Sequence, residues 1–351
     1  MSTADRLRVV VATPLDEGLC TRVEQLEPRI ELVRDQSLLP PMRWAADHSG
    51  DPAFSRTPGQ QATFEALLNS ADALYGLPDD SPAALARVVR ANPRLRWVQA
   101  MAAGGGAQVK AAGLTSEELD RVTFTTSAGV HGAPLAEFAV FGVLAGAKSL
   151  RRLLDQQAHR EWSGRWCMQQ VSEMTVVVLG LGSIGRQIAS RLIALGARVI
   201  GISRRPADMP GLTESVPPEK LAQVVSRADA LVVSLPGTAG THRLVSAEVL
   251  AAVRPGITVV NVGRGTVIDE EALVDALDDG RVGYAVLDVF DTEPLPRESR
   301  LWTHPGVLVS PHTAALNGAE DRKIAELFAT NATRLLDGRP LMNVVDTVEF
   351  Y

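Results

Sequence analysis

Three segments in the second half of the chain each follow an apolar run and contribute one side chain suited to acid–base chemistry or anion binding. These side chains are Arg264 in NVGRG, Glu293 in DVFDTEP and His312 in SPHTAA. An arginine binds a carboxylate through paired donors and keeps its charge, whereas a histidine exchanges a proton near neutral pH. A carboxylate beside the histidine orients the ring and favours its protonated form. The set suits reduction of a 2-oxo acid, with Arg264 holding the acid and His312 protonating the oxygen as a hydride reaches the carbonyl carbon.

Each of these residues also has an ordinary explanation when it is taken alone. Arg264 could be a surface turn residue, Glu293 an exposed loop acid and His312 a loop histidine with a structural partner. Their common placement favours the joint interpretation, because each follows a predicted strand of a parallel sheet. In open α/β sheets ligands bind at the carboxyl ends of the strands, so all three side chains would meet at one edge.

Apolar, β-branched runs that alternate with helical patterns predict an α/β protein with parallel sheets. The predicted strands are 7–13, 30–33, 71–75, 95–99 and 122–125 in the first half, and 175–179, 198–202, 230–234, 257–262, 282–288 and 307–310 in the second. Residues 36–60 show no clear period and predict a long loop. A long helix is predicted from Pro134 to about Ala158, and a last helix over 318–336.

A glycine-rich loop lies between the strand at 175–179 and the helix that follows it. The sequence Gly180-Leu181-Gly182-Ser183-Ile184-Gly185 has the G-x-G-x-x-G spacing of a dinucleotide-binding βαβ unit. Gly180 would allow the tight turn, Gly182 the approach of a pyrophosphate and Gly185 close packing of helix and strand. Free N–H groups at the start of the helix would bind the anion. The alternative is a structural turn with no ligand.

The residues at the end of the next strand would contact the ribose of such a dinucleotide and so distinguish NAD from NADP. A carboxylate there would bind the two ribose hydroxyls of NAD, but this chain has Ser203, Arg204 and Arg205. Serine and arginine suit a 2′-phosphate, so NADP is the preferred cofactor, and use of NAD stays open. The alternative is that both arginines are solvated surface residues.

Composition excludes several other classes of protein. The 351 residues predict two domains, and a net charge of −6 without a basic cluster argues against nucleic acid as a partner. The segment Met1–Arg8 has no apolar signal region, and no run of 18 uncharged apolar residues predicts a membrane span. The two cysteines, Cys20 and Cys167, predict a reducing compartment and neither a disulfide framework nor a metal site, so we expect a cytoplasmic protein.

The motifs VLGLGSIG, NVGRGTVIDEEAL, LDVFDTEPLP and SPHTAA resemble those of the D-isomer-specific 2-hydroxyacid dehydrogenase family. The resemblance runs from about Trp97 to the C-terminus, whereas residues 1–96 match mainly in their β/α pattern. It implies that Arg264 binds the substrate acid, that His312 is the general acid/base and that Glu293 pairs with His312. It also implies a set of residues that line the cofactor: Ser234, Leu235, Pro236, Val262, Gly263 and, at the nicotinamide end, Asp288.

The family fold implies two Rossmann-like, doubly wound domains hinged over a cleft. Residues 1–127, completed by 318–351, would form the substrate (catalytic) domain, and 128–317 the dinucleotide-binding domain. In the family a loop of the first domain binds the substrate carboxylate through backbone N–H groups, and here this loop corresponds to Ala102, Ala103 and Gly104. The glycine run 104–106 departs from the usual pattern.

Other implications of the resemblance concern the substrate side chain and the assembly. Trp302, in the loop before His312, could limit or stack on the substrate side chain, or it could be a packing residue. The family is commonly dimeric through the cofactor domain, and the arm 160–166 with Trp162 and Trp166 is a candidate contact; its alternative is packing within the chain. The family also includes corepressors of the same fold with little turnover, so a dinucleotide-binding regulatory protein is the alternative function.

Overall fold

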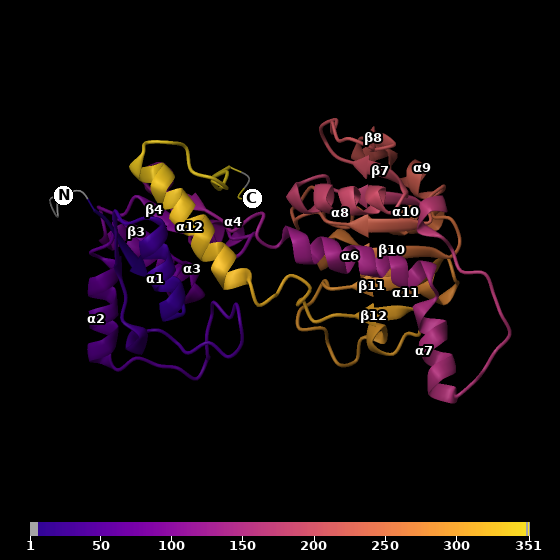
Figure 1. The fold of residues 1–351 in the computed structure, drawn as a ribbon, viewed down its shortest axis with the longest axis horizontal. Helices are drawn as coiled ribbons and strands as arrows, with labels where there is room; N and C mark the ends of the chain where they lie inside the picture. Colours follow the sequence, from indigo (N-terminus) through magenta and orange to yellow (C-terminus); the bar gives the residue numbers. More distant parts are fainter. Residues whose placement is uncertain (1–5, 349, 351) are drawn as a thin grey trace. The chain divides into compact units, whose positions relative to one another are not determined.

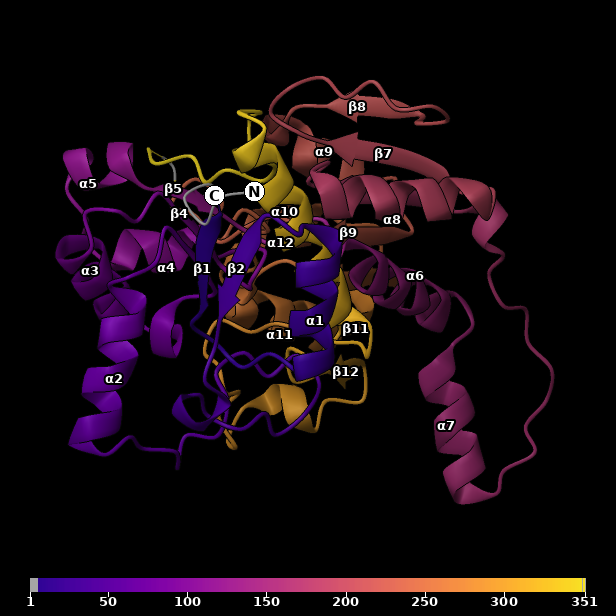
Figure 2. The same ribbon diagram turned by 60° about the vertical axis from the view of Figure 1, so that its left-hand side comes forward.

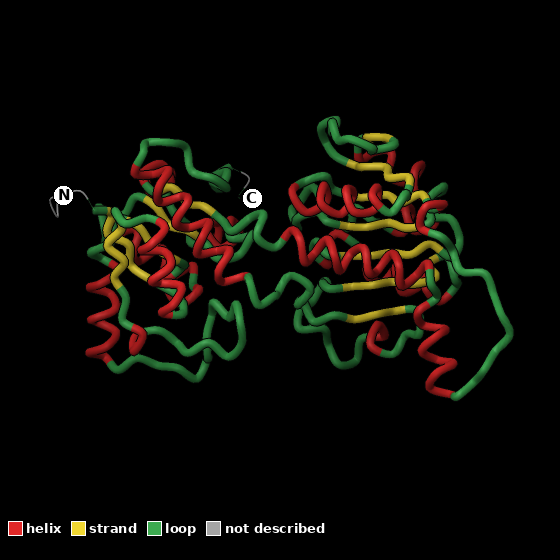
Figure 3. Tube along the Cα trace, viewed as in Figure 1, coloured by secondary structure: helices red, strands yellow, loops and turns green. Residues whose placement is uncertain are grey.

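The computed structural model describes residues 6–348 and 350, and residues 1–5 of the N-terminal segment considered above lie outside it. The chain divides into two compact units, one formed by Met1–His131 with Leu316–Tyr351 and the other by Gly132–Ala315. Each unit is a parallel β-sheet with helices packed against it (Figure 1, Figure 3). The predicted α/β class with two parallel sheets is confirmed.

The sheet of the first unit has the strand order β2-β1-β3-β4-β5, and all its neighbouring strands are parallel. Because β1 lies between β2 and β3, the chain winds outward from β1 in both directions, as in a doubly wound sheet. The strands are β1 (Leu7–Val11), β2 (Ile30–Val33), β3 (Ala73–Tyr75), β4 (Trp97–Gln99) and β5 (Thr123–Thr125). The helices are α1 (Glu17–Leu26), α2 (Pro58–Leu68), α3 (Pro82–Ala91), α4 (Gly106–Ala111), α5 (Ser116–Arg121) and α12 (Glu320–Leu336).

Helix α12 comes from the end of the sequence but belongs to the core of this first unit. Phe328 on α12 stacks on Trp97 of β4, with ring centroids 4.4 Å apart, and meets the edge of Tyr75 of β3 at 5.0 Å. All three side chains are fully buried. The C-terminal helix therefore closes one face of a sheet whose strands all precede residue 126.

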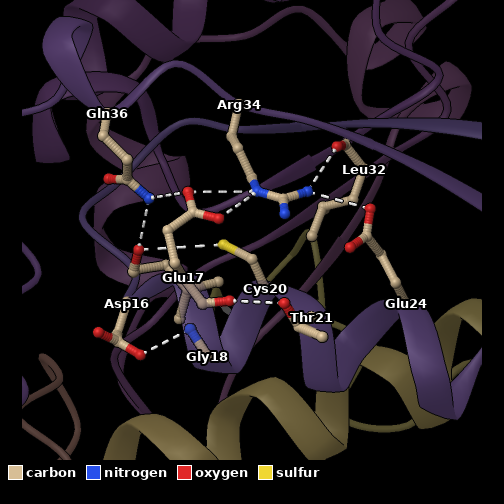
Figure 4. A network of polar contacts seen from close by, with 10 residues as sticks. Asp16, Glu17, Gly18, Cys20, Thr21, Glu24, Leu32, Arg34 and Gln36 are labelled. Carbon is tan, nitrogen blue, oxygen red and sulfur yellow. Dashed lines mark hydrogen bonds and ion pairs between the residues drawn. The ribbon is translucent and has the colours of Figure 1, made fainter.

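A polar network fastens the end of β2 to helix α1 (Figure 4). The guanidinium of Arg34 donates to Glu17 at 3.0 Å and to Glu24 at 3.0 Å. Gln36 donates to Glu17 and to the carbonyl oxygen of Leu15. The buried thiol of Cys20 belongs to the same network, since Sγ donates to the carbonyl oxygen of Leu15 at 3.9 Å. Burial raises its pKa to about 12, so Cys20 is not a nucleophile.

The loop predicted over residues 36–60 is shorter in the structure, because a 3-10 turn begins this segment and a helix starts before its end. A single 3-10 turn, η2 (Gln36–Leu38), begins it, and α2 starts at Pro58 because Thr57 caps the helix and Pro58 suits its first turn. Residues 41–51 close on themselves through a 2.9 Å hydrogen bond from the N–H of Asp51 to Pro41. The buried carboxylate of Asp47 accepts from Arg43 inside this closed loop.

The sheet of the second unit has the strand order β12-β11-β10-β9-β6-β7-β8, again all parallel. The strands are β6 (Thr175–Leu179), β7 (Arg198–Ile202), β8 (Glu214–Val216), β9 (Ala230–Val233), β10 (Ile257–Asn261), β11 (Val282–Leu287) and β12 (Val307–Val309). The helices are α6 (Gly132–Ala147), α7 (Leu150–His159), α8 (Ser183–Ala194), α9 (Leu221–Val225), α10 (Ala247–Ala252) and α11 (Glu270–Asp278). The edge strand β8 was not predicted, because its three residues are too few and too polar to give a pattern.

The prediction of a single long helix from Pro134 to Ala158 is wrong, because the structure contains two helices in this part of the chain. They are bent by 65° at a break that includes Ser149, whose φ is 53°. Helix α6 packs on the sheet, whereas α7 has no buried residue and extends away from the sheet with the segment after it (Figure 1, Figure 2). Among the described residues no single helix has the length and apolar character to cross a membrane; α6 and α7 meet that test only as a bent pair.

Candidate active site

Two glycines of the glycine loop, Gly180 and Gly185, have the backbone geometry expected of them. Gly180 has a φ of +100°, which strains residues with a side chain. A Cβ on Gly185 would lie 1.8 Å from the carbonyl oxygen of Gly180, so only glycine allows this approach of helix and strand. Gly182 precedes α8 with no side-chain cap, and a Cβ there would meet nothing within 4 Å. The start of α8, with Ser183 and Ile184, therefore fits the pyrophosphate of a dinucleotide.

The segment with Ser234 and Leu235 lies next to the glycine loop, and residues 203–205 form the turn after β7. The hydroxyl of Ser234 donates to the carbonyl oxygen of Gly180 at 2.9 Å, and a Cβ on Gly180 would be 2.9 Å from Leu235. The hydroxyl of Ser203 donates to the carbonyl oxygen of Arg205 at 2.6 Å, so the turn after β7 is held locally. The side chains of Arg204 and Arg205 are both exposed.

Arg264, Glu293 and His312 line one pocket of about 390 Å³ in the second unit. Nδ1 of His312 lies 2.7 Å from Oε2 of Glu293, and Oε1 of Glu293 accepts a hydrogen bond of 3.0 Å from the N–H of Phe290. The guanidinium of Arg264 donates to the carbonyl oxygen of Gly263 at 2.7 Å and is otherwise exposed to the pocket. The other residues that line the pocket are Gly237, Gly265, Thr266, Phe290 and Asp291.

Asp288 organises the turn that presents His312. Its side chain is 1% exposed, and Oδ1 accepts from the hydroxyl of Ser310 at 2.5 Å and from the N–H groups of Thr313 and Ala314 at 2.9 and 3.0 Å. The carbonyl oxygen of Asp288 also accepts from the N–H of His312 at 2.9 Å. The resemblance assigned Asp288 to the nicotinamide; the structure adds this positioning role.

Asn261 has a similar role at the end of β10, and the sequence analysis missed it. Its side chain is 1% exposed, accepts from the N–H of Gly263 at 3.0 Å and donates to the carbonyl oxygen of Arg264 at 3.1 Å. An asparagine at the carboxyl end of a buried strand is a known turn-forming signal, which could have identified it. Val262 is buried and Gly263 lies close to Leu235, so this turn packs against the 234–236 loop.

The loop Ala102-Ala103-Gly104 joins β4 to α4 in the first unit. Within the described residues, none of its three N–H groups donates to an acceptor. Ala102 and Gly104 are exposed and Ala103 is half-buried. A loop with free, exposed N–H groups fits an anionic ligand such as a carboxylate.

The remaining candidates are tryptophans of the second unit. Trp302 ends the 3-10 turn η7 (Arg300–Trp302), is 49% exposed and donates from Nε1 to the carbonyl oxygen of Pro296 at 2.9 Å. On the arm after α7, Trp162 is fully exposed, whereas Trp166 packs under Arg152 with 3.9 Å between the guanidinium carbon and the ring centroid. The structure therefore gives Trp166 an intrachain contact and Trp162 none among the described residues.

Known proteins are similar to this chain in sequence and in fold. The family model described as "D-isomer specific 2-hydroxyacid dehydrogenase, NAD binding domain" matches residues 140–314. A glyoxylate/hydroxypyruvate reductase A of Salmonella dublin is 31% identical over 310 residues, which cover 86% of this chain and 98% of the relative.

Two solved structures extend this likeness over almost the whole chain. A D-isomer-specific 2-hydroxyacid dehydrogenase from Xanthobacter autotrophicus Py2, in complex with NADPH and MES, is 29% identical with a TM-score of 0.75 and covers 99% of this chain and 100% of its own. An NADPH-dependent glyoxylate/hydroxypyruvate reductase from Sinorhizobium meliloti, in complex with NADP and sulfate, is 25% identical with a TM-score of 0.77 and the same coverage.

Fold, glycine loop and family together define an NAD(P)-dependent oxidoreductase, as the sequence predicted. The chain belongs to the D-isomer-specific 2-hydroxyacid dehydrogenase family.

Proposed function

We propose that this protein reduces a small 2-oxo acid of the glyoxylate or hydroxypyruvate kind to the D-2-hydroxy acid, with NADPH as the preferred reductant. The observation that carries the proposal is the 2.7 Å contact between His312 and Glu293 in one pocket with Arg264. The relatives that bear glyoxylate/hydroxypyruvate reductase names support the substrate class.

The residues divide the work according to their chemistry. Arg264 would bind the carboxylate and carbonyl of the substrate through its fork of donors. His312 would donate its proton to the carbonyl oxygen and take it back in the reverse reaction, and Glu293 would hold the ring in the right tautomer and stabilise its protonated form. The nicotinamide cofactor, when bound, supplies the hydride. Free N–H groups of Ala102, Ala103 and Gly104 would bind the substrate carboxylate, and Trp302 would border its side chain.

The preference for NADPH rests on the turn after β7. Residue 203 is a serine and not a carboxylate residue, and the exposed Arg204 and Arg205 suit a 2′-phosphate. The complexes of two neighbours with NADPH and NADP support this choice. Use of NAD as a second cofactor stays a prediction, as does contact of the cofactor with Ser234, Leu235, Pro236, Val262, Gly263 and Asp288.

We also infer which unit binds the cofactor, which unit binds the substrate, and how two copies of the chain assemble. The second unit would be the dinucleotide-binding domain and the first the substrate domain, hinged to it. A homodimer would form through the arm of the second unit, since Trp162 is fully exposed and Leu154 on α7 is 47% exposed. Light scattering on wild type and Leu154→Asp tests the dimer, and a monomeric wild type would contradict it. A cytoplasmic location stays a prediction.

A substrate panel tests the proposed reaction. Oxidation of NADPH and NADH is followed with glyoxylate, hydroxypyruvate, pyruvate and bulkier 2-oxo acids, and the product is analysed on a chiral column. We expect turnover with at least one small acid and a D product wherever the product is chiral. An L product, or no turnover over the panel with intact cofactor binding, would instead favour a regulatory dinucleotide-binding protein.

A further inference from the structure

We propose that Asp80 is a positioning residue for the loop 102–104, because its carboxylate fastens the helix that follows this loop to the rest of the first unit. The inference rests on the proposed function, in which the N–H groups of this loop bind the substrate carboxylate. Asp80 belongs to the 3-10 turn η3 (Pro78–Asp80) after β3 and had no role in the sequence analysis.

The loop has little local structure of its own to hold it in place. It runs into three consecutive glycines, Gly104 to Gly106, and glycine has the largest backbone freedom of any residue. Helix α4, which follows, has only six residues, and no side chain caps its start at Gly105. So short a helix is marginal unless other elements hold it.

One polar contact ties this region to another element. Nε2 of Gln108, on α4, donates to Oδ1 of Asp80 at 2.6 Å in a half-buried setting. Within the described part of the chain it is the only side-chain hydrogen bond that residues 101–111 make. The second oxygen of Asp80 accepts from the hydroxyl of Ser49 at 2.9 Å, so the same carboxylate also holds the closed loop 41–51.

The backbone of Asp80 supports a role for its side chain. Asp79 and Asp80 have φ values of 55° and 49°, so two successive residues that are not glycine adopt the left-handed conformation. This conformation costs free energy and persists only where surrounding contacts stabilise it. Asp79 pairs with Arg56 at 2.8 Å, and Asp80 pairs with Gln108 and Ser49.

Loss of the Asp80 contact should therefore weaken substrate binding and leave the proton transfer intact. The N–H groups of residues 102–104 would sample more orientations, so the carboxylate of the 2-oxo acid would bind less tightly in ground state and transition state alike. Such a change raises KM without changing kcat. His312, Glu293 and the glycine loop lie in the other unit of the chain, so KM for NADPH should not change.

The central variant is Asp80→Gly, because glycine keeps the left-handed backbone unstrained while both accepted hydrogen bonds are lost. We expect a rise of about three- to tenfold in KM for the 2-oxo acid, in the range of one partly exposed hydrogen bond to a charged group. Gln108→Ala should reproduce this rise, and the double variant should be no worse than either single variant. Asp80→Asn keeps an acceptor oxygen for Gln108 and tolerates the backbone, so it should restore a KM near that of wild type.

The matched control is Asp79→Gly, which makes the same change at the neighbouring left-handed residue but removes the pair with Arg56 instead. It should leave KM for the 2-oxo acid within about twofold of wild type. An equal rise in this control, an unchanged KM in Asp80→Gly, or additive effects in the double variant would overturn the assignment.

Hydrogen–deuterium exchange separates a failure of this inference from a failure of the proposed function, because it needs no turnover. Peptides covering residues 101–111 should exchange faster in Asp80→Gly and Gln108→Ala than in wild type and Asp79→Gly. Unchanged exchange in Asp80→Gly would overturn the positioning role whatever the enzyme assays give. Wild type without activity on any 2-oxo acid would contradict the proposed function alone.

Discussion

His131 and Glu320 are joined by a hydrogen bond of 2.9 Å between Nε2 and Oε1, and they lie close in sequence to the two points where the chain passes between its units. The side chain of Glu320 is 2% exposed. His48, from the closed loop 41–51, lies 3.7 Å from the same oxygen and 3.8 Å from Asp321. A buried carboxylate thus joins the start of α12 to two segments distant in sequence.

This contact predicts a specific loss of stability in acid. Burial raises the pKa of Glu320, but the hydrogen bond with His131 and the nearby ring of His48 outweigh it and hold that pKa at about 2, against 4.5 for the free group. Because the folded pKa is the lower one, the stabilisation is present above about pH 4.5 and is lost as the pH falls toward 2. It amounts to about 3 kcal/mol at neutral pH. Urea unfolding of wild type and Glu320→Gln between pH 7 and 3 should show a difference that shrinks below pH 4.5; a difference independent of pH would contradict this assignment.

Replacement of His312 should remove most turnover and leave cofactor binding nearly intact. General acid catalysis contributes about 10²- to 10⁴-fold to rate, and we expect His312→Ala to lose kcat in that range. Fluorescence titration with NADPH provides the control, since the glycine loop is unchanged. Near wild-type kcat at neutral pH would show that another group donates the proton.

Glu293→Gln preserves the shape of the carboxylate but removes its charge. Because Oε2 of Glu293 lies 2.7 Å from Nδ1 of His312 and orients the ring, we expect Glu293→Gln to lower kcat for reduction while the affinity for NADPH stays unchanged. Steady-state kinetics and a fluorescence titration with NADPH measure the two quantities. An unchanged kcat would mean that Glu293 does not orient His312 during reduction.

Replacement of both Arg204 and Arg205 by alanine should raise KM for NADPH and leave KM for NADH almost unchanged. Charge-assisted contacts with a 2′-phosphate are weakened at an exposed rim, so we expect a wild-type preference for NADPH of about ten- to a hundredfold in kcat/KM. Ser203→Asp should move the preference toward NADH, because a carboxylate binds ribose hydroxyls and repels phosphate. A wild type that prefers NADH would show that the two arginines do not meet the cofactor.

Strong local signals explain why most of the fold was predictable. Buried parallel strands are continuous apolar runs, and the glycine loop needs glycine at Gly180 and Gly185 for reasons of backbone geometry alone. The break at Ser149 was missed because Gly146 and Ser149, which can end one helix and begin another, also occur inside continuous helices. Asp80 and Asp288 were missed as positioning residues because their partners are distant in sequence, which no residue pattern reveals. Asn261 was missed although its partners are the backbone groups two and three residues further on, where an asparagine commonly forms a turn.

The backbone at His312 restricts which residues can replace it. Its φ of 53° lies in the left-handed region, which glycine, asparagine and aspartate enter readily and β-branched residues avoid. Glycine, asparagine and aspartate should therefore be the replacements that the turn accommodates best, whereas other side chains cost about 1–2 kcal/mol there. For trapping a complex with both substrate and reduced cofactor in a crystal, asparagine at position 312 is accordingly a better choice than valine or threonine, because it silences the reaction without displacing the turn.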